Sequence, residues 1–240
     1  MKRMAWILLA LLLFMSAMGS GNPRQALSER DRELPELNGM SVTTVEMVAV
    51  GDVLTMGEFE QDNDFTNGSE PLEWRVLKKS GHRVMLITEK IITARPFHET
   101  YKKLRWRACD LRTWLNGEFM GKAFTAAEQR LIQEVELVDS GNEDYGIGAG
   151  SETKDRVFLL DIDEAFSCFS SAADRAAVST KYADAQGFSK NADGWWWLRN
   201  AGQDLDHAAL IYKDGNVYRA GDSVSRTYIG VRPALWIELP

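Results

Sequence analysis

Alternating apolar and polar residues, separated by short polar turns, mark the chain from about residue 50 onward. A short apolar run at 53–59 is followed by the polar segment Q-D-N-D-F-T-N-G-S-E. Leu72, Trp74 and Val76 then alternate with polar residues. After a Ser-Gly turn, the run H-R-V-M-L-I-T-E-K-I-I is more fully apolar. Period-two alternation bounded by turn residues predicts strands of an antiparallel meander.

The hydrophobic spacing changes to a helical period in the middle of the chain. The stretch A-C-D-L-R-T-W-L-N-G-E-F places four apolar residues on one helical face: Leu111, Trp114, Leu115 and Phe119. Thr125 and Glu128 have the spacing of a capping box and predict the start of a second helix. A strand is expected to run into a helix at Asp161 or Asp163. The glycine-rich segment 141–150 is expected to form an exposed loop.

The last third of the chain returns to β-type patterns. The runs W-W-W-L-R, H-A-A-L-I-Y, N-V-Y-R-A and I-G-V-R-P-A-L-W-I are separated by polar turns. In the turn K-D-G, Gly215 can adopt the positive φ that a tight hairpin requires. The order of elements predicts an α+β fold, in which antiparallel β-meanders flank a helical middle.

The N-terminus has the layout of a secretory signal. The chain opens with M-K-R, continues with an apolar run at 4–18 and reaches small residues at A-M-G-S-G. We expect a signal peptide at residues 1–19, cleaved after Gly19, a polar linker at 20–45 and one folded domain at 46–240. An uncleaved membrane anchor is the alternative. The protein is expected to be secreted or extracytoplasmic.

Composition narrows the classes of function. The formal net charge of −7 argues against nucleic acid or an anionic membrane surface as a partner, because both require a basic surface. The sequence has no phosphate-cradling glycine loop and no zinc-ligand spacing, so we expect no cofactor. Cys109 and Cys168 are both surrounded by apolar residues, which favours two separate thiols over a disulfide.

Several ordered motifs resemble one protein family. They are Q-D-N-D-x-x-N-G-x-E-P-L-E-W-R-V-L, A-R-P-F, C-D-L-R-T-W-L-N-G-E-F, K-D-R-V-F-L-L-D-I-D-E-A, W-W-L-R and G-V-R-P-A-L-W-I. Together, over about residues 50–238, they resemble the bacterial exported family called domain of unknown function 6273. The family's biochemical role is not established, so this resemblance implies a domain and no mechanism.

A more distant resemblance concerns the end of the chain. The W-W-L-R segment, the following hairpin and the closing G-V-R-P strand are similar to the end of the C-type lectin-like fold, including its formylglycine-generating-enzyme branch. Val231 stands where that branch has an aromatic residue. Those enzymes use late cysteines, and no cysteine follows Cys168. The resemblance therefore implies a C-type lectin-like architecture without that activity.

The best candidate ligand-binding residues lie around the three tryptophans. Because side chains alternate along a strand, Trp195 and Trp197 should face one way and Trp196 the other, and most of these rings should be core. If one ring lines a groove, Arg199 and Asn200 can bind the hydroxyls of a stacked sugar. The remaining candidate is an arginine near the C-terminus, Arg232. It is expected either to pair internally with an acidic residue such as Asp110 or to clamp a ligand carboxylate.

Two chemical alternatives have weaker support. Asp62, Asp64 and Asn67 offer oxygen ligands for calcium, but the glutamate that closes an EF-hand loop is missing, and a polar turn explains them equally well. The acidic pairs Asp161/Asp163 and Asp204/Asp206 could in principle act as a glycosidase couple. Caps and turns are the more common use of such residues.

The sequence therefore favours an exported, non-catalytic ligand-binding domain that recognises a glycan or cell-surface component through loops at 199–206 and 219–228. An exported enzyme that uses acidic residues and a protein–protein interaction module are the alternatives. A groove with one exposed tryptophan would favour glycan binding. An open cleft with two carboxylates would favour the enzyme, and a flat apolar patch would favour the protein–protein interaction module.

Overall fold

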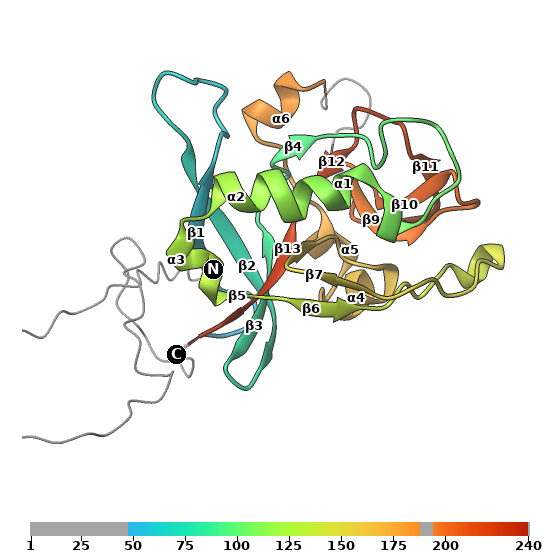
Figure 1. Cartoon of the computed structure of the whole chain (residues 1–240), viewed down its shortest axis with the longest axis horizontal. Coiled ribbons are helices and arrows are strands. Elements are labelled where there is room, and N and C mark those ends of the chain that lie inside the picture. Colours follow the sequence, from blue (N-terminus) through green and yellow to red (C-terminus); the bar gives the residue numbers. More distant parts are fainter. Residues whose placement is uncertain (1–47, 188–193, 240) are drawn as a thin grey trace, which may run out of the picture.

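The computed structural model describes residues 48–187 and 194–239 (Figure 1). The signal peptide and linker expected at 1–19 and 20–45 lie outside these residues. In the described part of the chain, no helix is long and apolar enough to cross a membrane. The fold is α+β, with mainly antiparallel sheets and short helices, as the sequence pattern predicts.

The first sheet contains the predicted N-terminal meander. Its strands follow the order β1-β2-β3-β13-β5, and β8 also pairs with β13. Their bounds are β1 (Val53–Phe59), β2 (Glu70–Ser80), β3 (Arg83–Thr88), β5 (Ile132–Gln133), β8 (Val157–Phe158) and β13 (Ala234–Glu238). All of these pairs are antiparallel. The last strand of the chain therefore lies next to the N-terminal meander.

The second sheet gathers the rest of the C-terminal strands. Its order is β11-β10-β9-β12-β4, with β4 (Thr93–Ala94), β9 (Trp196–Ala201), β10 (His207–Ile211), β11 (Val217–Ser223) and β12 (Gly230–Val231). Strands β10 and β11 form the predicted hairpin, and Gly215 has a φ of 80° in its turn. The pair β12–β9 is parallel, in contrast to the other pairs of this sheet.

The final run I-G-V-R-P-A-L-W-I, expected as one strand, is divided between the two sheets. Strand β12 ends before Arg232, and β13 begins after Pro233. Pro233 has no N–H to donate to a ladder, but its carbonyl accepts a hydrogen bond from Thr88 N at 3.0 Å. The Arg-Pro dipeptide thus marks the point where the chain crosses from one sheet to the other.

Short helices fill the space around the sheets. They are η3 (Trp106–Ala108), α1 (Asp110–Trp114), η4 (Leu115–Phe119), α2 (Met120–Ala123), α3 (Ala126–Leu131), η5 (Glu143–Tyr145), α4 (Ile162–Ser167), α5 (Ala172–Arg175) and α6 (Lys181–Ala185). A small hairpin of β6 (Val135–Leu137) and β7 (Thr153–Asp155) lies beside them. Helices α1 and α2 are joined through η4, a π-helical turn, into one continuous helical segment (Figure 1).

The predicted helix starts are confirmed. Thr125 and Glu128 form a complete capping box at α3, and Asp161 forms another with Glu164 at α4. Helix α1 begins differently, because the sulfur of Cys109 accepts the hydrogen bond from Arg112 N at 3.3 Å. Each cap satisfies backbone donors that a helix leaves free at its first turn.

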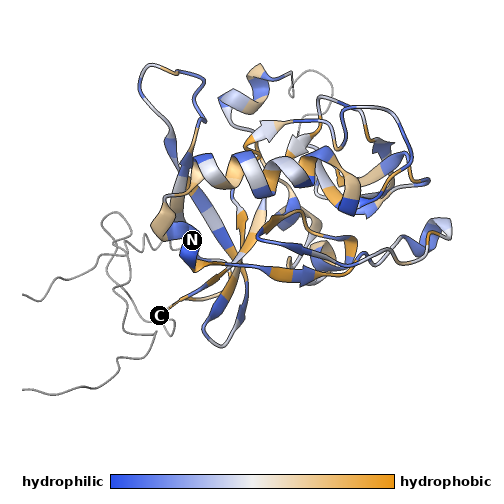
Figure 2. Cartoon of the chain, viewed as in Figure 1, coloured by the Kyte–Doolittle hydropathy of each residue, from blue (hydrophilic) through white to orange (hydrophobic). Residues whose placement is uncertain are grey.

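The core lies mainly on the inner faces of the two sheets. Leu72, Trp74 and Val76 are all buried, as their alternation predicts. The indole N–H of Trp74 donates to the carbonyl of Met56 at 2.8 Å, so the buried ring carries no unpaired polar group. Figure 2 shows that hydrophilic residues prevail in the β1–β2 loop, in contrast to the strands of the sheet interior.

The middle region contains two free cysteines and a partly buried glycine-rich loop. Cys109 and Cys168 are both free thiols, as expected. The segment 141–150 is only partly the exposed loop that its glycines predict. Asn142 is buried, and its side-chain amide donates to the carbonyls of Ala201 and Arg219, each at 2.9 Å. This amide ties the loop to strands β9 and β11.

Candidate functional site

The three consecutive tryptophans belong mainly to the core, as predicted. Trp196 and Trp197 are completely buried on opposite faces of β9. Their indole N–H groups donate to the carbonyl of Arg175 at 3.3 Å and to that of Arg95 at 2.9 Å. Trp195 is half-buried, and its ring lies 4.6 Å from that of Tyr212. The pair Trp195 and Trp197 therefore does not form one exposed aromatic surface.

Arg199 and Asn200 are occupied by internal partners. The Arg199 guanidinium pairs with Asp161 at 2.7 Å and with Glu164, the two residues of the α4 capping box. The Asn200 oxygen accepts a hydrogen bond from Ile162 N at 2.8 Å, and its nitrogen donates to Gly141 O at 2.7 Å. Both side chains are buried, so they fasten β9 to α4 and to the 141–150 loop.

The expected ion pair between Arg232 and Asp110 is wrong. Arg232 is fully buried and donates to backbone carbonyls, to Thr88 O at 2.7 Å and to Arg175 O at 3.2 Å. Burial lowers the pKa of its guanidinium to about 10. Asp110 instead lies 2.6 Å from Nδ1 of His98. Carbonyl oxygens satisfy the arginine without a second buried charge, which explains the outcome.

The candidate calcium residues form turns of the β1–β2 loop. Asp62 accepts hydrogen bonds from Asp64 N at 2.8 Å and from the Asn67 amide at 2.9 Å. The carboxylates that converge are those of Glu60, Asp62 and Glu70, whose oxygens lie within 4.8 Å of one another. These three are the described residues that could hold a metal ion, although calcium takes six to eight oxygens.

The acidic pairs considered for a glycosidase also have other partners. Asp161 caps α4 and pairs with Arg199, whereas Asp163 is exposed in the first turn of the same helix. Asp204 pairs with Lys103 at 2.7 Å, and Asp206 lies 2.6 Å from Nδ1 of His207. Each carboxylate thus has a structural explanation, and neither pair lines the pocket described next.

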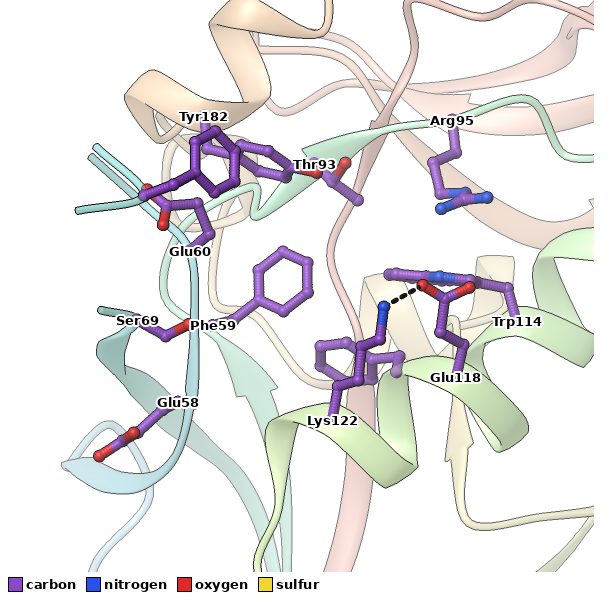
Figure 3. Close-up of a pocket in the computed structure, with 12 residues that line it drawn as sticks. Glu58, Phe59, Glu60, Ser69, Thr93, Arg95, Trp114, Glu118, Lys122 and Tyr182 are labelled. Carbon is purple, nitrogen blue, oxygen red and sulfur yellow. Dashed lines mark hydrogen bonds and ion pairs between the residues drawn. The ribbon is translucent and has the colours of Figure 1, made fainter. Parts of the chain in front are cut away.

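A pocket of about 240 Å³ opens between the β1–β2 loop and the helical segment α1–η4–α2 (Figure 3). We call it the aromatic pocket. Strand β1 and its loop form one wall, the helical segment forms the opposite wall, and β4 with α6 closes one end. The lining residues are Glu58, Phe59, Glu60, Phe65, Ser69, Thr93, Arg95, Trp114, Glu118, Phe119, Lys122 and Tyr182.

Edge-to-face contacts between aromatic rings hold the walls of the aromatic pocket together. The Phe59 ring lies 5.5 Å from Phe119, 5.7 Å from Tyr182 and 6.3 Å from Trp114, each in a T-shaped arrangement. Trp114 and Phe119 are themselves 5.3 Å apart. Such pairs stabilise the arrangement beyond simple burial. We call these four rings together the aromatic wall; Phe59 comes from β1, Trp114 and Phe119 from the helical segment, and Tyr182 from α6.

The π-turn η4 positions part of this wall. A π-turn inserts one residue into a helix, so side chains five apart are brought onto one face, and such turns are frequent at functional sites. Here Trp114 and Phe119 are five apart, and both line the pocket. Glu118 points to the rim, where it pairs with Lys122 at 2.8 Å (Figure 3). That pairing lowers the pKa of the Glu118 carboxyl.

Sequence reasoning did not identify the aromatic pocket, although one local signal pointed to it. Phe65 is the single aromatic residue in the polar segment Q-D-N-D-F-T-N-G, and it is 72% exposed. An exposed aromatic residue in a turn has no core to explain it. The other wall residues come from elements far apart in the sequence, and no local pattern relates Phe59 to Trp114 or Tyr182.

Comparison with known proteins identifies the chain at the level of its family. No curated protein and no solved structure matches it. Residues 81–239 match the family described as Domain of unknown function (DUF6273). The match begins later than the resemblance at about residue 50 suggests, so β1 and the β1–β2 loop lie outside it. Because the match covers more than half of the sequence, the chain belongs to the family of domain of unknown function 6273.

Proposed function

We propose that this chain is an exported, non-catalytic ligand-binding domain that holds one residue of a glycan in the aromatic pocket. The observation that carries the proposal is the pair of aromatic rings of Phe59 and Tyr182, with Phe65 at the rim, beside polar groups in one opening. Aromatic faces stack on the apolar C–H faces of sugars, while carboxylates and hydroxyls bind sugar hydroxyl groups. Glu60 and Thr93 supply those polar groups.

The size of the pocket favours a single ring. Sites for drug-sized ligands usually measure about 300–1,000 Å³. A volume of about 240 Å³ is smaller than that range and suits one monosaccharide unit. The pocket opens to solvent at its rim, where Glu118 and Lys122 are both exposed. A terminal sugar of a longer glycan can therefore enter with the rest of the chain outside.

Phe65 extends the aromatic wall toward solvent. Its ring lies 6.1 Å from Tyr182, and its loop is fastened by turn contacts such as that of Thr66 with Asp64 at 2.6 Å. An ordered loop that presents an exposed aromatic ring offers a contact surface with little ordering cost on binding. This position suits a second stacking contact with the ligand.

The C-type lectin-like resemblance of the C-terminal strands agrees with a sugar ligand as a fold-level analogy. The N-terminal pattern of the sequence supports export, which would bring the domain to cell-surface glycans. This proposal places binding at the aromatic pocket and no longer at 199–206, because Arg199 and Asn200 are engaged inside the protein.

A glycan-array screen of the 240-residue chain, followed by calorimetric titration of each hit, tests the proposal. We expect Phe65→Ala to weaken binding by about tenfold or more, because burial of a phenylalanine ring contributes about 1.5–3 kcal/mol. Tyr145→Ala is the matched control, since Tyr145 is also an exposed aromatic residue and does not line the pocket.

Two results would contradict the proposal. One is the absence of any glycan hit for the folded protein. The other is an equal loss of affinity in Phe65→Ala and Tyr145→Ala, which would place the ligand elsewhere. Capture of a protein partner that depends on Phe65, without any glycan hit, would favour the interaction-module alternative.

A further inference from the structure

Arg95 is held at the aromatic pocket by its backbone. Its N–H donates to the carbonyl of Ile229 at 3.2 Å, and its carbonyl accepts the indole N–H of Trp197 at 2.9 Å. The following residue is Pro96, which restricts Arg95 to an extended backbone conformation. The buried Trp197 thus contributes to the pocket indirectly, by positioning this arginine.

The guanidinium of Arg95 lies against the pocket wall. Its central carbon is 4.6 Å from the centre of the Trp114 ring, and Figure 3 shows it facing this ring inside the opening. A guanidinium stacked on an aromatic face keeps its N–H groups directed outward, in the plane of the fork. The stack therefore orients the donors of Arg95 before any ligand arrives.

These donors have no acceptor within residues 48–187 and 194–239. The partner of the guanidinium there is the Trp114 ring, and no carboxylate forms an ion pair with it. Glu118 is close enough for the charge of Arg95 to contribute to its lowered pKa, but its hydrogen bond is with Lys122. Lys122 thus pairs with the Glu118 carboxylate, and the Arg95 guanidinium forms no hydrogen bond with it among the described residues.

The other carboxylates of the pocket do not take this role. The Glu60 carboxylate accepts a hydrogen bond from Asp64 N at 3.1 Å, within the β1–β2 loop. Glu58 is exposed and lies on the β1 side of the opening, opposite Arg95 (Figure 3). The pocket consequently has Arg95 and the Glu118–Lys122 pair on one side, and the carboxylates of Glu58 and Glu60 on the side of β1 and its loop.

We infer that the sugar bound in the aromatic pocket is acidic, and that Arg95 binds its carboxylate with two parallel hydrogen bonds. This inference rests on the proposed glycan-binding function and adds the substrate class. An arginine fork matches the geometry of a carboxylate, which a neutral hydroxymethyl group cannot reproduce. A hexuronic acid presents both required groups, an apolar ring face for the aromatic wall and a carboxylate at the ring edge.

The test uses two probes that differ at a single position. Methyl glucuronide carries a carboxylate where methyl glucoside carries a hydroxymethyl group, and both are titrated calorimetrically into the 240-residue chain. The variants are Arg95→Gln and Arg95→Lys. Arg83→Gln is the matched control, because Arg83 also lies over a tryptophan, Trp236, at 5.8 Å, but does not line the pocket.

We expect the unmodified protein to bind the glucuronide about tenfold to hundredfold more tightly than the glucoside. Arg95→Gln should bind both sugars equally, and Arg83→Gln should keep the full preference. Arg95→Lys should keep a reduced preference, because an ammonium is a point charge without the fork. If Arg95→Gln does not fold, Arg95→Lys decides the question, because its preference for the glucuronide over the glucoside should be smaller than that of the unmodified protein.

The outcomes separate this inference from the proposed function. Equal affinity for the two sugars, or a preference that persists in Arg95→Gln, would overturn the acidic ligand and leave glycan binding intact. If neither sugar binds but another neutral glycan binds in the array, the acidic ligand is likewise overturned and glycan binding stands. A failure of every sugar would overturn both proposals.

Discussion

Strand β9 and the aromatic pocket contain the same kinds of residue in different roles. In β9, Trp196, Trp197 and Arg199 are all buried, and both indole N–H groups and the two terminal nitrogens of the Arg199 guanidinium donate to protein acceptors. In the pocket, Trp114 and Arg95 stack on one another with the arginine donors unpaired among the described residues. Tryptophan and arginine therefore do not mark a binding site by themselves. What distinguishes a core residue from a candidate site residue here is whether its polar groups have hydrogen-bond or ion-pair partners inside the protein.

The two regions are nevertheless connected. The Trp197 indole donates to the Arg95 carbonyl, and the Phe97 ring lies 5.9 Å from that of Trp197. The segment W-W-W-L-R thus forms a scaffold that supports the pocket from the protein interior, through the contact of Trp197 with Arg95. Changes in β9 should act on stability, whereas changes at the pocket should act on binding.

Arg199→Ala should have the largest effect of the substitutions considered. It removes the cation from Asp161 and Glu164 and leaves two partly buried carboxylates without their partner. Breaking a buried ion pair in this way costs about 3–5 kcal/mol. Urea denaturation should show that loss. Lys103→Ala, which breaks the exposed pair with Asp204, should leave the midpoint unchanged. Equal effects of the two substitutions would contradict the comparison.

The thiol of Cys109, the N-cap residue of α1, should give an intermediate, pH-dependent effect on stability. Burial raises its pKa from an ordinary value of 9.0 to about 12. The folded protein therefore retains this proton at a pH where the unfolded chain loses it. The contribution of the protonated thiol to the free energy of unfolding is fully present below about pH 9 and decreases as the pH rises toward 12.

Urea denaturation between pH 8 and pH 11 checks this expectation. The free energy of unfolding should decrease more steeply with pH in the unmodified protein than in Cys109→Ala. Cys168→Ala is the control, since Cys168 is only half-buried. Parallel curves for the unmodified protein and Cys109→Ala would contradict the assignment of a buried, protonated thiol.

Among the substitutions at the scaffold and the pocket, controls excepted, Arg95→Gln should have the smallest effect on stability. It removes one cation–π contact from a half-buried position, which is worth about 0.5–1 kcal/mol. Thermal unfolding should therefore change little, while the preference for an acidic sugar disappears. A loss of stability as large as that of Arg199→Ala would show that Arg95 is a structural residue, and the distinction between scaffold and pocket would fail.

Much of the local structure could be predicted from the sequence. The alternation of Leu72, Trp74 and Val76 predicts β2, and Thr125 with Glu128 predicts the start of α3. These signals involve neighbours along the chain, whose spacing alone decides which face they share. The division of G-V-R-P-A-L-W-I between two sheets was not predicted, because β12 and β13 take their partners from distant segments.

The candidate site was predicted poorly for the same reason. Arg199, Asn200 and Arg232 have the chemistry of a binding site, but the strands and helices that pack over them supply all of their observed partners. In the sequence, Arg95 is distinguished only as part of the A-R-P-F motif. Its donors have no acceptor among the residues that the structure describes, and this depends on where α1 and α2 place Trp114 and Lys122.

The sequence by itself determined the α+β class, the family, the helix caps and the largely buried state of the three tryptophans. Each of these follows from short-range spacing or from motif order. Only the tertiary structure decided which arginine is satisfied and which remains available, and that Phe59, Trp114 and Tyr182 share one pocket. Burial and partner choice depend on contacts between segments far apart in the chain, and local periodicity carries no information about those contacts.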